Sequence, residues 1–298
     1  MTGAPEDAGR RAHYRDFYEP GTGPVALVHG NCQAEALRVL LAPALPDLQA
    51  VRVPPVHELT ASDLPHLDAL LRRARLLVAQ PVRPGYRDLP LGTAEVAARC
   101  AAEVVVVPAV RISTVHPFQA IVRDPEDPSR PPPVVAYHDL RTLAVAAGAR
   151  PRRVAAQALL DVGQAAVDEL ARRERHTDVG VSDVVAGLGT AATWTINHPG
   201  NAVLQVLVTR VLARLGRVGV VTDPGRDLLG SVKAPLEEQV LSARGLTDTP
   251  REHWLVEGRQ ISDEEVRAAQ MSWYAAHPRV VAAGLARHGA TLQRLGLL

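Results

Sequence analysis

Short apolar runs rich in valine and leucine recur through the first third of the chain and constrain its fold most strongly. They lie at Val25–Val28, Val51–Val53, Leu76–Val78 and Val104–Val107. The segments between them, such as NCQAEALRVLLA, have apolar residues at helical spacing. Strands that alternate with helices form βαβ units, whose parallel sheet is covered by helices on both faces. We therefore expect an α/β fold with flanking helices around a parallel sheet of about four to five strands.

The chain changes character after Val107. The segment RDPEDPSRPPPVVAYHD is rich in proline, which lacks a backbone N–H, so we expect a loop at the surface or over a site. From Arg152 onward the periodicity is mainly helical. We expect a flexible segment over residues 1–22 and a single integrated domain over 23–298. Within that domain, 23–125 form the α/β core, 126–150 a Pro-rich loop region and 151–298 a mainly helical part.

Composition excludes several classes of function. The 298 residues have a formal net charge of +1, which gives no electrostatic reason to expect nucleic-acid binding. No apolar run is long enough for a membrane span, and two distant cysteines fit a reducing, cytoplasmic compartment. No P-loop, dinucleotide fingerprint or zinc motif is found, so we expect no metal. The sequence leaves open whether the chain forms a homo-oligomer.

The first strand ends in Gly30-Asn31-Cys32-Gln33. In a parallel sheet, sites form beyond the carboxyl ends of strands. Gly30 permits a sharp turn or a close approach, and Asn31 is a good helix cap whose amide can point donors into a cleft. Cys32 would lie in the first helical turn, where free N–H groups lower a thiol pKa and can receive an oxyanion together with Gln33. The alternative, a buried cysteine in an ordinary turn, stays open.

The stretch VALVHGNCQAEALRVLL resembles the opening signature of the WcbI-like polysaccharide (capsule) biosynthesis family. Further segments follow in the family's order: VAQPVRPGYRDLPLGT, VVVPAVRISTVHPF, YHDL, TINHPGNAVL and SWYAAHP. The resemblance covers about residues 25–278 and implies coenzyme A binding and an acetyltransferase-like activity. It also implies a fold similar to that of the SGNH hydrolases, with a flavodoxin-like sheet.

A thiol nucleophile needs a base, and His198 is the best candidate among 11 histidines. It follows Asn197 and precedes a helical segment, a usual location for a site residue. The family resemblance favours a role for His198 as base or general acid. The alternative is that Asn197-His198 forms a helix cap and turn in which the imidazole already has its hydrogen-bond partners. His116 is a second candidate for substrate contact or base, and His29 either faces the cleft or is buried.

Polar residues also follow the third and fourth strands. Gln80 comes directly after an apolar run and is expected at the same sheet edge as Asn31. Arg83, Tyr86 and Arg111 are expected as further substrate contacts, because guanidinium and phenol groups bind phosphate, carboxylate and hydroxyl groups. Solvated loop arginines are the alternative.

These observations lead to one functional hypothesis and two alternatives. We expect a CoA-dependent acyltransferase, in the first instance an acetyltransferase, acting on a hydroxyl or amine of a sugar or natural-product acceptor. Cys32 and His198 would be catalytic, while the neighbouring polar residues would bind the oxyanion and the substrate. The alternatives are an SGNH-like thiol esterase or thioesterase, and a non-catalytic protein that binds CoA or a glycan.

Overall fold

The structure, a computed structural model, describes residues 3–298, with side-chain surroundings from residue 8 onward. Contacts divide the chain into two compact units, each assembled from several segments. Unit 1 comprises Met1–Ala109, Ala171–Asp183 and Asn201–Leu229, and unit 2 comprises Val110–Leu170, Val184–Gly200 and Gly230–Leu298. This division differs from the expected single domain, because the helical C-terminal half contributes segments to both units.

The core of unit 1 is a four-stranded sheet in the order β2-β1-β3-β4, in which all paired strands are parallel. The expected α/β fold class is therefore confirmed. The strands are β1 (Val25–His29), β2 (Gln49–Ala50), β3 (Ala74–Ala79) and β4 (Glu103–Val106). The register aligns His29 with Ala79 and Ala79 with Val106, so three strands end at one sheet edge.

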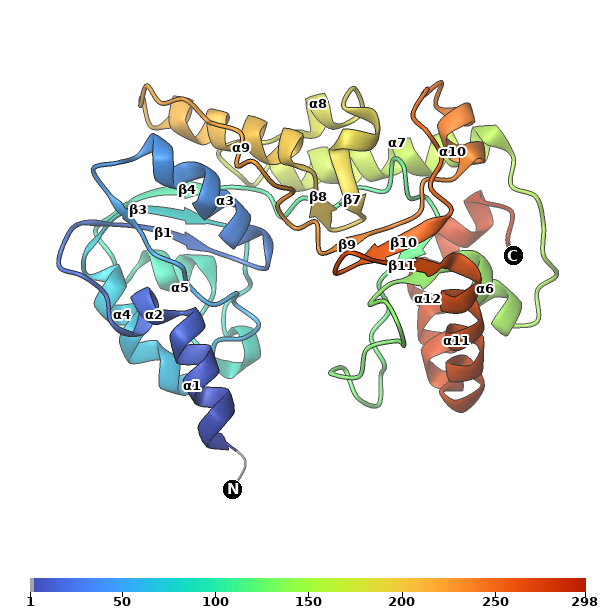
Figure 1. The fold of residues 1–298 in the computed structure, drawn as a ribbon, viewed down its shortest axis with the longest axis horizontal. Coiled ribbons are helices and arrows are strands. Elements are labelled where there is room, and N and C mark those ends of the chain that lie inside the picture. Colours follow the sequence, from blue (N-terminus) through green and yellow to red (C-terminus); the bar gives the residue numbers. More distant parts are fainter. Residues whose placement is uncertain (1–2) are drawn as a thin grey trace. The chain divides into compact units, whose positions relative to one another are not determined.

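Helices cover both faces of this sheet (Figure 1), as its fully buried strand β1 requires. α3 (Gln33–Leu41) and α9 (Asn201–Arg214) pack together on one face, and α4 (Leu64–Leu71) and α5 (Thr93–Ala97) lie on the other. The helix expected within the segment NCQAEALRVLLA, residues 31–42, is thus present as α3, and the helical segment expected after His198 is α9. The connecting α7 (Ala156–Glu174) and α8 (Ser182–Val185) extend over the boundaries between the units.

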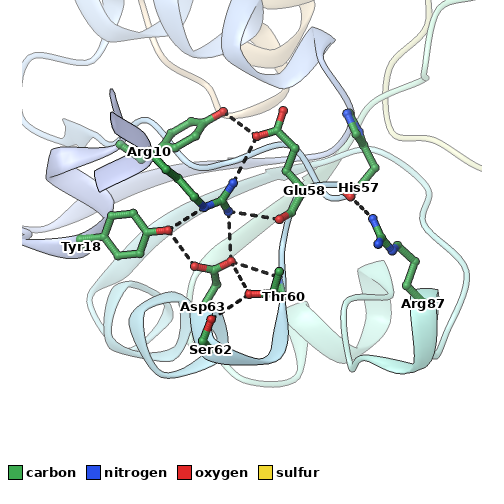
Figure 2. Close-up of polar contacts among 9 residues, drawn as sticks. Arg10, Tyr18, His57, Glu58, Thr60, Ser62, Asp63 and Arg87 are labelled. Atoms are coloured by element: carbon green, nitrogen blue, oxygen red, sulfur yellow. Dashed lines mark hydrogen bonds and ion pairs between the residues drawn. The ribbon is translucent and has the colours of Figure 1, made fainter. Parts of the chain in front are cut away.

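The N-terminal segment is helical, where a flexible segment was expected. α1 (Gly3–His13) is followed by α2 (Arg15–Tyr18), whose Phe17 is fully buried. Figure 2 shows the polar cluster that holds it: Arg10 donates to the Tyr18 hydroxyl at 2.9 Å and to the Asp63 carboxylate at 3.0 Å. The Tyr18 hydroxyl in turn donates to Asp63 at 2.8 Å. Charge and apolar burial together fix this segment to unit 1.

Unit 2 combines a small antiparallel sheet with a helical layer. The sheet has the order β11-β10-β9, and its hairpin turns at Glu257-Gly258, both with positive φ, as a tight two-residue turn requires. α6, α11 and α12 pack against one another around a shared apolar core. The elements are β9 (Val232–Lys233), β10 (His253–Val256), β11 (Arg259–Ser262), α10 (Glu238–Ala243), α11 (Asp263–Ala276) and α12 (Pro278–Arg294).

The Pro-rich region is more ordered than a loop over 126–150 would be. It lacks a regular element up to Tyr137, as proline predicts, and then forms β6 (His138–Asp139) and α6 (Leu140–Ala146). Asp139 caps α6 by accepting the backbone N–H groups of Arg141 and Thr142. Strand β6 pairs with β5 (Gln119–Ala120), and β7 (Thr193–Thr195) pairs with β8 (His198–Pro199).

Candidate functional site

The turn after β1 is built around a close approach between Gly30 and Gln80. A Cβ atom on Gly30 would lie 2.3 Å from Oε1 of Gln80, closer than any real contact permits. Gln80 is buried, and its Oε1 accepts the backbone N–H of Asn31 at 2.9 Å. Glycine is therefore needed here to accommodate a side chain of the protein itself.

The amide of Gln80 connects the ends of three neighbouring strands. Its Nε2 donates to Oε1 of Gln33 at 3.0 Å and to the carbonyl of Pro108, after β4, at 3.4 Å. Gln80 thus shares one sheet edge with Asn31, as expected from the strand order. Because these polar atoms are already used inside unit 1, they hold the turn in shape rather than facing a ligand.

Asn31 precedes Cys32, the N-cap residue of helix α3, and bonds to the first turn of that helix. Its Oδ1 accepts the backbone N–H of Gln33 at 2.9 Å, and its carbonyl accepts the N–H of Ala34 at 2.9 Å. The side-chain Nδ2 makes no hydrogen bond to any described residue. Two donor hydrogens of Asn31 are therefore available at the beginning of the helix.

Cys32 lies at the N-terminal end of α3 and is half-buried. Burial raises the pKa of the Cys32 thiol, while the backbone N–H groups of Cys32 and Gln33 lower it by less. The expectation that the helix N-terminus favours the thiolate is therefore wrong for the protein without a ligand. The desolvation cost of the charged sulfur exceeds the stabilisation by the local N–H groups.

The other sequence candidates of unit 1 surround this turn less directly. His29 is buried, and its Nε2 bonds to the carbonyl of Leu91 at 2.8 Å. Of the two alternatives for this residue, a side chain that faces the cleft or one that is buried, the structure shows the buried one. Burial lowers the pKa of His29, which keeps the ring neutral. Tyr86 packs against the apolar core, and Arg83 is exposed. Neither position shows a preformed contact with Cys32.

His198 belongs to unit 2, at the start of β8 and three residues before α9. Its ring packs edge-on against Tyr137 with 6.2 Å between centroids. Its Nδ1 is buried and has no hydrogen-bond partner among the described residues, and burial lowers the pKa of the imidazole. Nearby, Oδ1 of Asn197 accepts the hydroxyl of Thr195 at 3.3 Å. His198 is thus a neutral imidazole with an unused nitrogen.

His116 and Arg111 also belong to unit 2. His116 is buried, which lowers its pKa to about 4, and its Nε2 has no partner among the described residues. The positive charge of Arg111 lowers the pKa of His288 and so lies near that ring. Since Cys32 is in unit 1, its pairing with His198, His116 or Arg111 stays a prediction.

Two further kinds of feature are absent from the residues that the structure describes. Among them, no three His, Cys, Asp or Glu side chains are grouped so as to hold a metal ion. None of the described helices is both long and apolar enough to cross a membrane.

A half-buried cysteine at a strand-to-helix turn of a parallel sheet defines an α/β protein with a candidate thiol site. The model of the polysaccharide biosynthesis enzyme WcbI matches residues 25–219, more than half of the chain, and the chain belongs to this family. The resemblance inferred from the sequence is thereby confirmed. A comparison with curated proteins gives no match.

A solved structure has the same fold. It superposes with a TM-score of 0.76 at 19% sequence identity and covers 93% of this chain and 99% of the other. That structure is described as WcbI, a novel polysaccharide biosynthesis enzyme, in a native form without a disulfide bond between CoA and one of its cysteines. At this identity the likeness shows the fold, whereas the family membership rests on the sequence match.

Proposed function

We propose that the protein transfers an acyl group, in the first instance acetyl, from CoA to a hydroxyl or amine of a sugar-like acceptor. The observation that supports this most is the turn at Gly30–Gln33, which places the Cys32 thiol beside unused hydrogen-bond donors at the start of α3. Membership of a polysaccharide biosynthesis family supports a glycan-related acceptor. A natural-product scaffold that carries sugar-like hydroxyls remains within this proposal.

The donors at the turn suit the charge that develops during acyl transfer. Asn31 Nδ2 makes no bond to the described residues, and the backbone N–H of Cys32 lies close enough to its own sulfur to lower the pKa of the thiol. Two donors that need no rearrangement would stabilise the oxyanion of a tetrahedral intermediate. Gln33 and Gln80 would act one step away, by holding Asn31 and the helix start in place.

The proposed base is His198. Burial lowers the pKa of its imidazole, so the ring is neutral at pH 7 and ready to accept a proton. In direct transfer, His198 takes the proton of the acceptor hydroxyl while the acceptor oxygen bonds to the acyl carbon. The acyl carbon–sulfur bond of acyl-CoA then breaks, and the CoA thiolate receives the proton from the imidazolium. His116 is the alternative base, and Arg83, Tyr86 and Arg111 are second-rank candidates for contacts to substrate.

A covalent version passes through Cys32. The thiol gives its proton to His198, the thiolate attacks the acyl carbon, and CoA leaves as the thiol with that proton. The acceptor then gives its proton to His198 and attacks the Cys32 thioester, the bond between the acyl carbon and the Cys32 sulfur breaks, and the Cys32 thiolate takes the proton back from the imidazolium. The raised pKa of Cys32 makes this proton transfer necessary, because little thiolate is present at neutral pH. The solved structure is described as free of a disulfide bond between CoA and one of its cysteines, and we propose Cys32 as the contact to the CoA thiol in this chain.

Turnover of acetyl-CoA with a set of sugar and amino-sugar acceptors tests the proposal. We expect CoA release that depends on an acceptor and an acetylated product of matching amount. Loss of turnover in Cys32→Ala together with an acetylated Cys32 in the parent favours the covalent version, and full turnover in Cys32→Ala excludes it. Rapid release of CoA and free acetate without any acceptor would identify a thioesterase and contradict the transferase.

A further inference from the structure

Unit 2 contains a large cavity that the proposed chemistry at Cys32 does not use. It has a volume of about 680 Å³ and lies between α6, residues 150–152, the first turns of α11 and Leu297. Volumes of this size accommodate small organic ligands. A neighbouring hollow of about 380 Å³ shares Arg141 and Asp263 with it.

Guanidinium groups dominate one part of this cavity. Arg150, Arg152 and Arg267 line it. All three are exposed to solvent, and none forms an ion pair with a described residue. Arg152 donates one bond, to the carbonyl of Gly296 at 3.3 Å. Unpaired guanidiniums that converge on a concave site bind phosphate through paired N–H donors.

A fourth arginine of the same unit, Arg141, has its guanidinium paired with carboxylates. Arg141 donates to Asp139 at 2.6 Å and to Glu237 at 2.7 Å, and lies 3.9 Å from the centroid of the Phe118 ring. Its charge is thus compensated by two carboxylates. The contrast indicates that Arg150, Arg152 and Arg267 are left available for a charged group that the protein does not supply.

The first turn of α11 offers acceptors instead of donors. Asp263 accepts the indole N–H of Trp254 with Oδ1 at 2.9 Å, and its Oδ2 has no partner among the described residues. Glu264 lines the same cavity, and its carboxylate is likewise unpartnered there. Carboxylate oxygens with free lone pairs accept hydrogen bonds from hydroxyl groups. Apolar side chains line the same cavity; they are Ala144, Val145, Ala268, Met271 and Leu297.

We infer that this cavity binds a phosphate-bearing sugar, with the phosphate on Arg150, Arg152 and Arg267 and the sugar hydroxyls on Asp263 and Glu264. A ligand of this class offers partners to both sets of unpartnered groups, and the apolar side chains that line the same cavity suit the C–H face of a pyranose. This inference rests on the proposed function, to which it adds the class of acceptor: a sugar phosphate or a nucleotide-linked sugar.

Isothermal titration calorimetry of the full chain with glucose 1-phosphate and with UDP-glucose tests the inference in the absence of CoA. We expect at least one of the two to bind, and Arg267→Gln or Arg150→Gln to weaken that binding about tenfold or more, since a hydrogen bond to a charged group contributes ~1.5–3 kcal/mol. Arg259→Gln is the matched control. Arg259 is exposed on β11 of the same unit, does not line the cavity, and its replacement is expected to leave binding unchanged.

Three results would overturn the inference. These are no binding of either sugar phosphate, equal weakening by Arg259→Gln, or binding of adenosine 3′,5′-bisphosphate that matches the sugar phosphates and depends on the same arginines. The last result would assign the cavity to the phosphate end of CoA. Because no acyl transfer is measured, a failure here leaves the acetyl-CoA assay unaffected, and failure of that assay leaves this binding result intact.

Discussion

Replacing Gly30 by alanine should destabilise the protein through Gln80. The new Cβ would lie 2.3 Å from Oε1 and 2.9 Å from Cδ of that side chain, so the buried amide must move. Its displacement breaks the bonds from the Asn31 N–H, to Gln33 Oε1 and to the Pro108 carbonyl. Each such bond contributes on the order of 1 kcal/mol and an unpaired buried amide costs more, so we expect Gly30→Ala to lower the free energy of unfolding by about 3 kcal/mol.

Denaturant unfolding of a double-mutant cycle isolates this contact. Gln80→Ala alone should cost about 2–3 kcal/mol. The double variant Gly30→Ala/Gln80→Ala should cost no more than Gln80→Ala, because the clash disappears with the amide. Gly23→Ala is the matched control, since its Cβ meets nothing within 4 Å. Additive costs of the two single replacements would refute the account of this turn.

Three further predictions concern the site and its unit. Asn31→Asp keeps the cap acceptor but removes the Nδ2 donors, so we expect kcat to fall by about 10²–10³ with a nearly unchanged unfolding curve; unchanged kcat would exclude Asn31 from the oxyanion site. The pKa of buried His116 is lowered to about 4, so as the pH falls the unfolded chain takes up this proton before the folded chain does. The free energy of unfolding should therefore fall by ~2 kcal/mol between pH 7 and pH 5 because of this histidine. Denaturant titrations of His116→Asn should show that this pH dependence is lost. Arg10→Ala leaves the Asp63 carboxylate, 4% exposed, without its guanidinium partner and should lower the free energy of unfolding by about 1–3 kcal/mol. Arg15→Ala, at an exposed ion pair, should lower it by less than ~0.5 kcal/mol. Equal losses of stability would contradict a specific role for the cluster around Asp63.

Local sequence signals predict the elements around the turn well. The apolar run Val25–Val28, the Gly30-Asn31 turn and the following periodic segment correspond to β1 and α3, because each element is specified by residues close in sequence. The hairpin β10–β11 is not among the expected elements, although Glu257-Gly258 between two short β-rich runs is a turn signal, because the flanking helical patterns obscure it. Its strands are only four residues each.

Two properties of the site depend on tertiary packing and are not readable from the sequence. The strand order predicts the location of Gln80 at the sheet edge, but its role as an internal hydrogen-bonding group follows from the register of three strands. The pKa of Cys32 is raised because the folded chain buries the sulfur, whereas the sequence shows only the favourable helix start. The division into two units from interleaved segments likewise has no local sequence signal.

The most direct test of the central claim is whether the thiol of CoA reaches Cys32. Incubation with CoA disulfide, followed by intact-mass and peptide mass spectrometry, measures thiol–disulfide exchange: the Cys32 sulfur attacks, a mixed disulfide forms and one CoA leaves as thiol. We predict a gain of one CoA on Cys32 that Cys32→Ser abolishes, that Cys100→Ser leaves intact and that excess acetyl-CoA slows. Labelling of Cys100 at an equal rate, or labelling of Cys32 that acetyl-CoA does not slow, would contradict a CoA site at this turn.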